Sequence, residues 1–221
     1  MRTNFLLNSL KILAGLLILA LPGSSSALVI NFSGVSAGIP ILSSYSESGF
    51  TFTSEHFHTF SSGALCLCAD DGFGYIGEED GGVGVDITMA LTAGGPFSLI
   101  SFAGAELWVP PAPPALPNAT EILVTGSLFG GGSVFKSFSL DGVVDGLAGP
   151  ADFQAFLLPG TFTNLVSVTF SGRRGESGGG AVAIANLNLN LNIHEPAAAG
   201  LLALGLVGLG LSDRLRKTTI G

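Results

Sequence analysis

The chain has 221 residues, of which 47% are hydrophobic and 11% are charged, with 33 Gly and two Cys. Disordered chains combine low hydrophobicity with high charge, collagen needs a strict glycine period, and small disulfide-framework folds need many cysteines, so the composition excludes all three classes. The formal net charge is −8. Apolar runs and most of the positive charge lie at the two ends of the chain, which therefore differ in physical character from the middle.

The first 27 residues have the layout of a secretory signal peptide. Arg2 and Lys11 make the start basic, residues 12–21 form an apolar stretch, and the small residues Ser25 and Ala27 stand at the −3 and −1 positions of a cleavage site. We expect export and cleavage after Ala27. An uncleaved anchor helix is the alternative, although about ten apolar residues are too few to cross a hydrocarbon core of ~30 Å.

The last part of the chain combines a proline-initiated apolar segment with a basic end. Pro196 suits the first turn of a helix, where its missing N–H matters least. The apolar residues 197–211 would span about 22 Å as a helix, which a membrane tolerates by thinning and by snorkelling of flanking arginines. The basic residues that follow favour a cytoplasmic location. We therefore expect residues 197–211 to hold the protein in the inner membrane with its body outside.

This C-terminal order resembles the PEP-CTERM sorting signal of exported bacterial proteins, a tail that is also labelled an ice-binding protein C-terminal domain. The resemblance implies processing by an exosortase-type membrane enzyme, with an inner-membrane intermediate that moves on to the cell surface or extracellular matrix. The residues that carry it, over the segment 194–217, are His194, Glu195, Pro196, Arg214, Arg216 and Lys217. His194 stands where the family's motif begins with Pro, so this chain departs from the motif at one position.

The body between the two ends is strongly acidic. Residues 28–194 hold three basic residues, Lys136, Arg173 and Arg174, against fourteen acidic ones, which gives a formal charge of −11. Nucleic-acid binding requires a basic patch or stripe, so we expect no nucleic-acid partner. A surface of this sign attracts divalent cations instead.

Short alternating or β-branched runs separated by Gly, Ser, Asn, Asp and Pro fill the body, and no window shows a helical period. This pattern predicts an all-β protein with a single antiparallel, jelly-roll-like β-sandwich domain over 28–193, flanked by the signal helix and the membrane helix. Alternation places Val166, Val168 and Phe170 on one strand face, and Phe50 and Phe52 on another. The predicted strands are 28–32, 49–53, 55–60, 64–68, 85–92, 97–102, 106–109, 121–127, 133–140, 153–158, 164–171 and 181–193.

Histidines and cysteines at alternate positions suggest a first candidate site. If 56–60 and 64–68 form a hairpin, His56 faces Cys68 and His58 faces Cys66, and two nitrogens and two thiolates could surround Zn²⁺. Export favours oxidised cysteines, and a Cys66–Cys68 disulfide needs a local bend because Cβ atoms two residues apart on a strand are roughly 6–7 Å apart. Metal ligation, a strained disulfide and free thiols remain the three alternatives.

An acidic, glycine-rich segment is the second candidate site. Clustered carboxylates on a flexible backbone suit Ca²⁺, which takes hard oxygen ligands. Residues 81–86 fit the Gly-Gly-x-Gly-x-Asp pattern of calcium-binding repeats in a single copy, and the alternative is a solvated loop. The candidate ligands are Asp70, Asp71, Glu78, Glu79, Asp80 and Asp86.

The last predicted strand carries a regular row of amides. Leucines at 187, 189 and 191 alternate with Asn186, Asn188, Asn190 and Asn192, so one face is apolar and the other presents four side-chain amides. Such a row can hydrogen-bond a glycan, and the alternative is a solvated strand face.

Catalytic patterns are weak in this sequence. Residues 175–179 satisfy Gly-x-Ser-x-Gly, but a nucleophile elbow needs a strand before and a helix after the serine. We therefore expect no enzyme, no required cofactor, and an exported structural protein of the cell surface or extracellular polysaccharide. A glycan- or Ca²⁺-binding β-sandwich module is the alternative. A secreted hydrolase is a third class, since two catalytic carboxylates can lie far apart in sequence.

Overall fold

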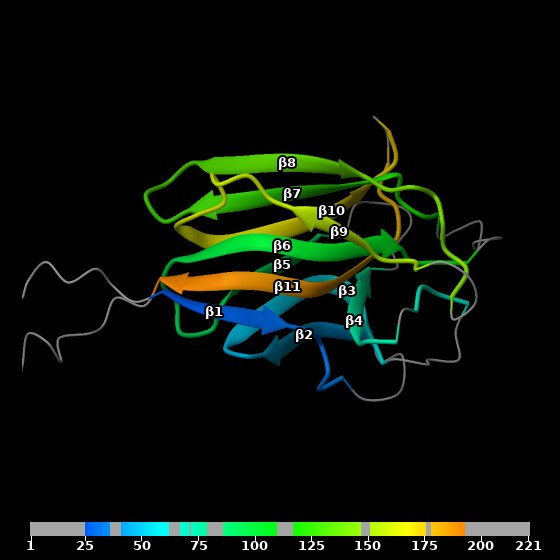
Figure 1. Ribbon diagram of the computed structural model, residues 1–221, viewed down its shortest axis with the longest axis horizontal. Coiled ribbons are helices and arrows are strands. Elements are labelled where there is room, and N and C mark those ends of the chain that lie inside the picture. The colour runs from blue at the N-terminus through cyan, green and yellow to red at the C-terminus, as the bar shows by residue number, and fades with distance from the viewer. Residues whose placement is uncertain are drawn as a thin grey trace, which may run out of the picture. The chain divides into compact units, whose positions relative to one another are not determined.

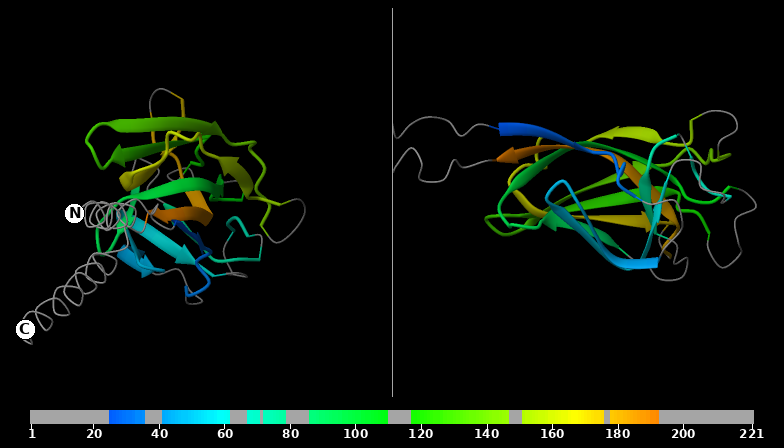
Figure 2. Two further views of the ribbon diagram at one scale, coloured as in Figure 1. Left: turned by 60° about the vertical axis from the view of Figure 1, so that its left-hand side comes forward. Right: turned by 90° about the horizontal axis from the view of Figure 1, so that it is seen from below.

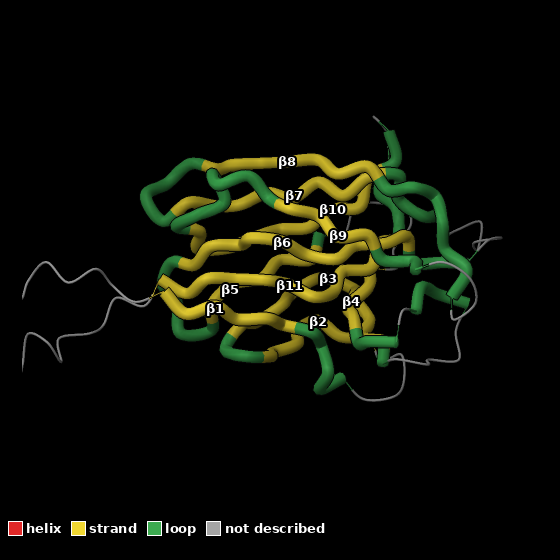
Figure 3. Tube along the Cα trace, viewed as in Figure 1, coloured by secondary structure: helices red, strands yellow, loops and turns green. Residues whose placement is uncertain are grey.

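The computed structural model describes residues 25–35, 41–61, 67–70, 72–78, 86–109, 117–146, 151–175 and 178–192. Residues Ser26–Asn192 form one compact unit. Of the expected signal peptide only residues 25–27 are described, and the expected sorting segment over 194–217 lies outside the described residues. In the described part the chain consists of strands and loops (Figure 3), and no helix there has the length and apolarity to cross a bilayer.

Eleven strands run through the described residues, and the strand pairs whose register is defined are antiparallel. The all-β, antiparallel class predicted from the sequence is confirmed. The strands are β1 (Ser25–Ile30), β2 (Ile41–Glu47), β3 (Phe50–Phe60), β4 (Tyr75–Glu78), β5 (Ile87–Leu91), β6 (Phe97–Glu106), β7 (Glu121–Leu128), β8 (Ser133–Ser139), β9 (Gln154–Leu157), β10 (Leu165–Arg173) and β11 (Val182–Asn192).

The strand boundaries differ from the predicted ones where tertiary pairing decides them. The predicted strands 49–53 and 55–60 form one strand, β3, because Ser54 between them is compatible with an extended chain. Strands β2 and β4 are not predicted from the sequence. β2 is rich in serine, and the four-residue β4 lies in the acidic glycine-rich segment, where pairing with both β3 and β11 holds it.

All eleven strands belong to one connected sheet. Its order is β8-β7-β10-β5-β3-β4-β11-β6-β9, with β2 added beside β3 and β1 beside β11. A further pairing of β10 with β6, at Leu165 and Phe97, joins distant parts of this order. The sheet therefore folds back on itself so that β10, β5 and β3 face β6 and β11 across a common interior (Figures 1 and 2).

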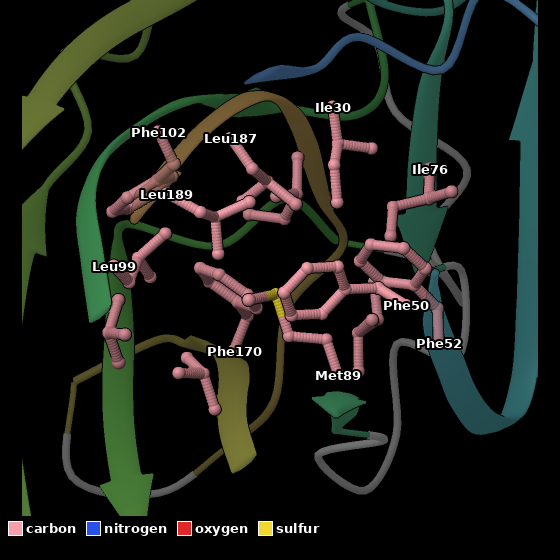
Figure 4. Packing of buried hydrophobic residues seen from close by; sticks show 14 of the residues in the cluster. Ile30, Phe50, Phe52, Ile76, Met89, Leu99, Phe102, Phe170, Leu187 and Leu189 are labelled. Atoms are coloured by element: carbon pink, nitrogen blue, oxygen red, sulfur yellow. The ribbon is translucent and has the colours of Figure 1, made fainter. Parts of the chain in front are cut away.

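The interior between these two layers is filled mainly by aromatic and aliphatic side chains (Figure 4). Phe102 from β6 contacts Phe170 from β10 with ring centroids 5.3 Å apart, and Phe50 from β3 contacts Phe97 from β6 at 5.1 Å, both edge to face. These side chains are at most 1% exposed. Edge-to-face rings add favourable quadrupole contacts to the burial of apolar area, so these pairs tie the two layers together.

Aromatic rings also fill the gap between the two edge strands β8 and β9. Phe138 of β8 and Phe156 of β9 have centroids 5.0 Å apart, and both contact Phe102 behind them. The β8 and β9 side of the interior is thus covered by side chains rather than by a further strand pairing.

Strand β10 shows both the strength and the limit of the alternation argument. Val168 and Phe170 are fully buried, as predicted, but Val166 is 37% exposed and Leu165 takes the buried position. A register irregularity between Leu165 and Ser167 inserts the extra residue that turns Val166 outward. Phe50 and Phe52 share the buried face of β3, as predicted.

A row of hydroxyl side chains crosses the outer face of the layer. Thr53, Thr88, Thr169 and Thr125 are successive register partners on β3, β5, β10 and β7, and the row continues to Phe135 on β8. Thr88 and Thr169 share a hydrogen bond of 2.9 Å between their hydroxyls. The row shows that β3, β5, β10 and β7 present polar side chains on their outer faces, and that these side chains line up across the layer as far as the edge strand β8.

Close backbone packing at the end of β10 generates a first prediction. The N–H of Gly180 donates to the carbonyl of Gly172 at 3.3 Å, and a Cβ on Gly172 would overlap the carbonyl oxygen of Gly180. Gly172→Ala should therefore destabilise the fold by about 1–3 kcal/mol, because backbone atoms cannot move aside as a flexible side chain can. Thermal unfolding followed by circular dichroism measures the effect.

The matched control for this substitution is Gly130→Ala in the turn between β7 and β8. A Cβ at Gly130 meets nothing within 4 Å, so this variant should keep the wild-type melting temperature. Equal melting temperatures for wild type, Gly172→Ala and Gly130→Ala would contradict the proposed close packing.

Candidate functional site

A groove lies on the outer face of β7, β8 and β10, which run side by side (Figure 1). It is open to solvent and has a volume of ≈ 520 Å³. Seven described residues line it: Glu121, Leu123, Phe135, Lys136, Ser137, Arg173 and Gly175.

The register of the three strands builds this groove. Arg173 of β10 is the partner of Glu121 at the start of β7, and Leu123 of β7 is the partner of Ser137 on β8. Because side chains on one strand face recur every second residue, Glu121 and Leu123 share the outer face, as do Phe135 and Ser137. The core-facing residues between them, Ile122 and Val124, are fully buried. Apart from Lys136, whose register partner is the buried Val124, the groove side chains on these strands belong to the outward half of strands whose inward half forms the core.

The backbone that carries Arg173 is held from two sides. The N–H of Thr120 donates to the carbonyl of Arg173 at 2.8 Å, and Arg173 forms an isolated antiparallel bridge with Gly179. Behind it, a Cβ on Gly180 would lie 2.5 Å from the backbone of Ala119, so only glycine fits there. This packing fixes the backbone position of Arg173, from which its long, exposed side chain extends.

The side chains of the groove combine an apolar surface with polar groups. Phe135 is 75% exposed, which is unusual for a phenylalanine in a protein with a large core. The hydroxyl of Ser137 donates to Oε2 of Glu121 at 2.6 Å, so the carboxylate is oriented within the groove. A groove with an exposed ring at one end, a guanidinium at the other, and an oriented carboxylate and a hydroxyl can stack on an apolar face of a ligand and hydrogen-bond its polar edge.

A second polar cluster is buried where three loops meet, and it consists of carboxylates that hold loop backbones. Asp152 is fully buried; its Oδ1 accepts from the N–H of Asp145 at 2.7 Å, and its Oδ2 accepts from the N–H groups of Asp70 at 2.9 Å and Gly146 at 3.1 Å. Asp70 is 5% exposed and accepts from the N–H of Gly72 at 2.8 Å. Such bonds satisfy buried backbone donors in loops that have no strand partner.

Glu106, the last residue of β6, is the third acid of this cluster. Its side chain is 3% exposed, and its Oε1 accepts from the N–H of Gly142 at 2.7 Å, while its buried Oε2 has no hydrogen-bond partner. Burial raises the pKa of Glu106, and the negative charges of Asp141 and Asp152 raise it further. The cluster therefore favours the neutral form of this carboxyl group.

The sequence-predicted histidine and cysteine site is not assembled as expected. The register partners of His58 are Ile41 on β2 and Gly77 on β4, so both edges of β3 at His58 are occupied by strands other than the predicted one. Cys68 forms an isolated bridge with Trp108, and it is disulfide-bonded. A disulfide sulfur is not the thiolate that Zn²⁺ requires. The side chain of His56 and the whole of Cys66 lie outside the described residues.

The candidate calcium ligands are separated in the structure where it describes them. Asp70 lies in the buried cluster with Asp152, whereas Asp86 is exposed and accepts a hydrogen bond from the hydroxyl of Ser171 on β10. Among the described residues no group of three or more His, Cys, Asp or Glu is placed to hold a metal. The side chain of Glu78 and the residues Asp71, Glu79 and Asp80 lie outside the described part.

The asparagine row on β11 is present in the part that the structure describes. Leu187 and Leu189 are fully buried, and Asn188 and Asn190 are partly exposed between them, as the alternation predicts. Asn186 has a positive φ of 47° at a register irregularity of β11, so it departs from the regular row. The side chain of Asn192 is not described, and whether the row binds a glycan stays a prediction.

The sorting residues have no structural description. They are His194, Glu195, Pro196, Arg214, Arg216 and Lys217, all outside the described residues.

No family model matches the chain, and no curated protein matches its sequence. Among solved structures it is similar to a DUF4465 family protein from Bacteroides caccae, with 14% identity, coverage of 74% of this chain and 98% of that one, and a TM-score of 0.45. It is also similar to the K1 cleaved adhesin domain of Lys-gingipain from Porphyromonas gingivalis, with 10% identity, coverage of 74% and 97%, and a TM-score of 0.40. Likenesses at this level do not indicate what this chain binds.

The raised pKa of Glu106 generates a prediction about pH. A folded-state pKa above the ordinary value of 4.5 means that the folded protein binds this proton more tightly than the unfolded chain. The stabilisation from protonated Glu106 is thus complete below the unfolded pKa and is lost as pH rises through the folded pKa. Glu106→Gln keeps an acceptor for Gly142 and carries no charge, so its stability relative to wild type should improve as pH rises.

Melting temperatures of wild type and Glu106→Gln from about pH 4 to about pH 8 measure this difference. Glu55→Gln, at an exposed position of β3, controls for the loss of one surface carboxylate. A difference between Glu106→Gln and wild type that does not change with pH would contradict the effect of burial on Glu106.

Proposed function

We propose that the chain is an exported, non-enzymatic protein of the cell surface or extracellular polysaccharide, whose jelly-roll-like body binds a glycan in the groove of β7, β8 and β10. The observation that carries this proposal is the exposed ring of Phe135 in a groove that also presents Arg173 and an oriented Glu121. Ligand sites are typically concave, with apolar walls and a few polar groups that fix orientation, and this groove has both features.

A sugar ring suits such a surface for a physical reason. One face of a pyranose exposes C–H groups, which pack on an aromatic ring, and its edge carries hydroxyls that donate and accept hydrogen bonds. Phe135 supplies the ring, Glu121 supplies acceptors, and Arg173 supplies donors at the far end of the groove. The partly exposed amides of Asn188 and Asn190 on β11 are the other glycan-binding surface that the sequence suggests. The exposed ring of Phe135 belongs to the groove of β7, β8 and β10 and not to β11.

A binding role fits the groove better than a hydrolytic one. Glycosidases use two carboxylates on either side of the scissile bond. Among the described residues that line the groove, Glu121 is the single carboxylate, and the hydroxyl of Ser137 already engages it. We therefore assign the groove to recognition.

The location of the protein is proposed from its terminal segments. The signal peptide over 1–27 would export the chain, residues 197–211 would hold it in the inner membrane, and an exosortase-type enzyme would act near His194, Glu195 and Pro196. The protein would then pass to the cell surface or matrix, where polysaccharide is available to the groove.

Substitution of the exposed phenylalanine tests the groove. Phe135→Ala should reduce retention on a panel of immobilised polysaccharides at least about tenfold, because the stacking surface is lost while no core contact changes. Affinity electrophoresis through gels that contain each polysaccharide measures the retention.

Phe129→Ala is the matched control, because Phe129 is also exposed, at 66%, but does not line the groove. It should bind like wild type. If wild type is retained by none of the polysaccharides, or if Phe129→Ala loses retention as strongly as Phe135→Ala, the groove is not a glycan site.

Fractionation of cells tests the proposed sorting. A tag inserted at the exposed turn Gly94-Gly95, between β5 and β6, should be found first in the inner-membrane fraction and later in a released form. Intact mass of the released form should show that both terminal segments have been removed. Glu195→Ala should increase the membrane-bound fraction, because the processing motif is altered.

Recovery of the full-length chain, uncut at both ends, in the cytosol would contradict export. Equal release of wild type and Glu195→Ala would instead contradict the role of the C-terminal motif alone.

A further inference from the structure

We infer that the groove of β7, β8 and β10 takes an acidic polysaccharide, with a uronate carboxylate of the polymer bound by Arg173. This inference rests on the proposed glycan binding and specifies the chemical class of the glycan. Two observations support it: the distribution of charge over the body and the position of Arg173.

The three basic residues of the body lie on or next to two of the strands that form the groove. Residues 28–194 carry three basic side chains against fourteen acidic ones. Arg173 faces the groove, whereas Lys136 borders it from the edge strand β8 with its side chain on the opposite strand face, because its register partner is the buried Val124. The third, Arg174, follows Arg173 in the chain. An acidic body repels a polyanion in general, so a local cationic surface is required wherever a polyanion binds. Arg173, the outward-facing cation among the described groove residues, is therefore the group that can bind a polyanion here.

Arg173 is the residue best placed to recognise a carboxylate. Its backbone is held by Thr120 and by the bridge to Gly179, whereas its side chain is exposed. The carboxylate opposite it in register, Glu121, is engaged through Oε2 by the hydroxyl of Ser137 at 2.6 Å. A guanidinium can donate two parallel hydrogen bonds to one carboxylate, which gives both strength and orientation.

Lys136 contributes positive charge but is less informative. It lies on the edge strand β8 between Phe135 and Ser137, and its register partner is the buried Val124. Lysine on an edge strand also prevents pairing with other chains, so its presence has a second explanation. Arg173 ends β10, a strand that pairs with β7 on one side and β5 on the other, so edge protection does not explain its charge. Arg173 is therefore the residue that the experiment substitutes.

Phe135 and Arg173 lie at different positions along the groove, so a polymer can contact both. Phe135 is in register with Thr125 of β7, and Arg173 is in register with Glu121, four residues earlier in the same strand. Four residues along a strand correspond to about 13 Å, which is the length of two to three sugar residues in an extended chain. The geometry thus fits stacking of one sugar on Phe135 and pairing of a uronate two to three residues further along the polymer with Arg173.

The experiment compares one polymer in two charge states. The full chain or its released form is measured against polygalacturonate and against the same polymer after full methyl esterification, which removes the carboxylates. Wild type should bind polygalacturonate at least about tenfold more tightly than the ester. Arg173→Gln should remove that preference, while Arg174→Gln, which also removes one positive charge but lies outside the groove lining, should retain it.

The outcomes separate this inference from the proposed function. Equal binding of both polymers, or equal loss in Arg173→Gln and Arg174→Gln, would overturn the acidic specificity and leave glycan binding in place. Retention only by neutral polysaccharides of the wider panel would also overturn the specificity. Retention by no polysaccharide at all would overturn both. Circular dichroism melting of each variant confirms that a loss of binding is not a loss of folding.

Discussion

The burial of one face of each central strand is the constraint on which the rest of the structure depends. Val168 and Phe170 on β10 are fully buried, and Phe170 contacts Phe102 from the opposite layer. A shift of β10 by one residue would turn these side chains outward and bring Thr169 and Arg173 into the interior. Burying the guanidinium of Arg173 without a partner would cost far more free energy than any single surface contact could supply. The core thereby fixes which residues reach the groove.

The fold class was predictable because strand alternation is a local property of the sequence. Phe50 and Phe52, and Leu187 and Leu189, occupy the buried faces that their spacing predicts. The failures are positions where pairing between distant segments decides the structure. Val166 is turned outward by an irregularity next to Leu165, and β4 exists because β3 and β11 lie on its two sides. Neither effect has a signature in a single segment.

The site was less predictable for a related reason. The arrangement of His58 and Cys68 was deduced from a local hairpin, but His58 has Ile41 and Gly77 as its partners, from two other strands. The groove combines residues of three strands, and its lining includes residues as far apart in the sequence as Glu121 and Arg173. One signal was available in the sequence, namely that the otherwise acidic body has only three basic residues. Only the strand register shows that Arg173 faces the groove and that Lys136 lies on the opposite strand face.

Acidic side chains have two different roles in this body, and the difference bears on ligand binding. Asp152 and Asp70 are buried and accept hydrogen bonds from loop N–H groups, so their positions are determined by the loops they hold. Glu121 is on the surface, where Ser137 orients it beside Arg173. Carboxylates that are committed to loop backbones are unavailable to cations or sugars, whereas an oriented surface carboxylate beside a guanidinium can recognise hydroxyls. Acidity by itself therefore does not mark the proposed ligand site, which is instead distinguished by Arg173 on an otherwise acidic body.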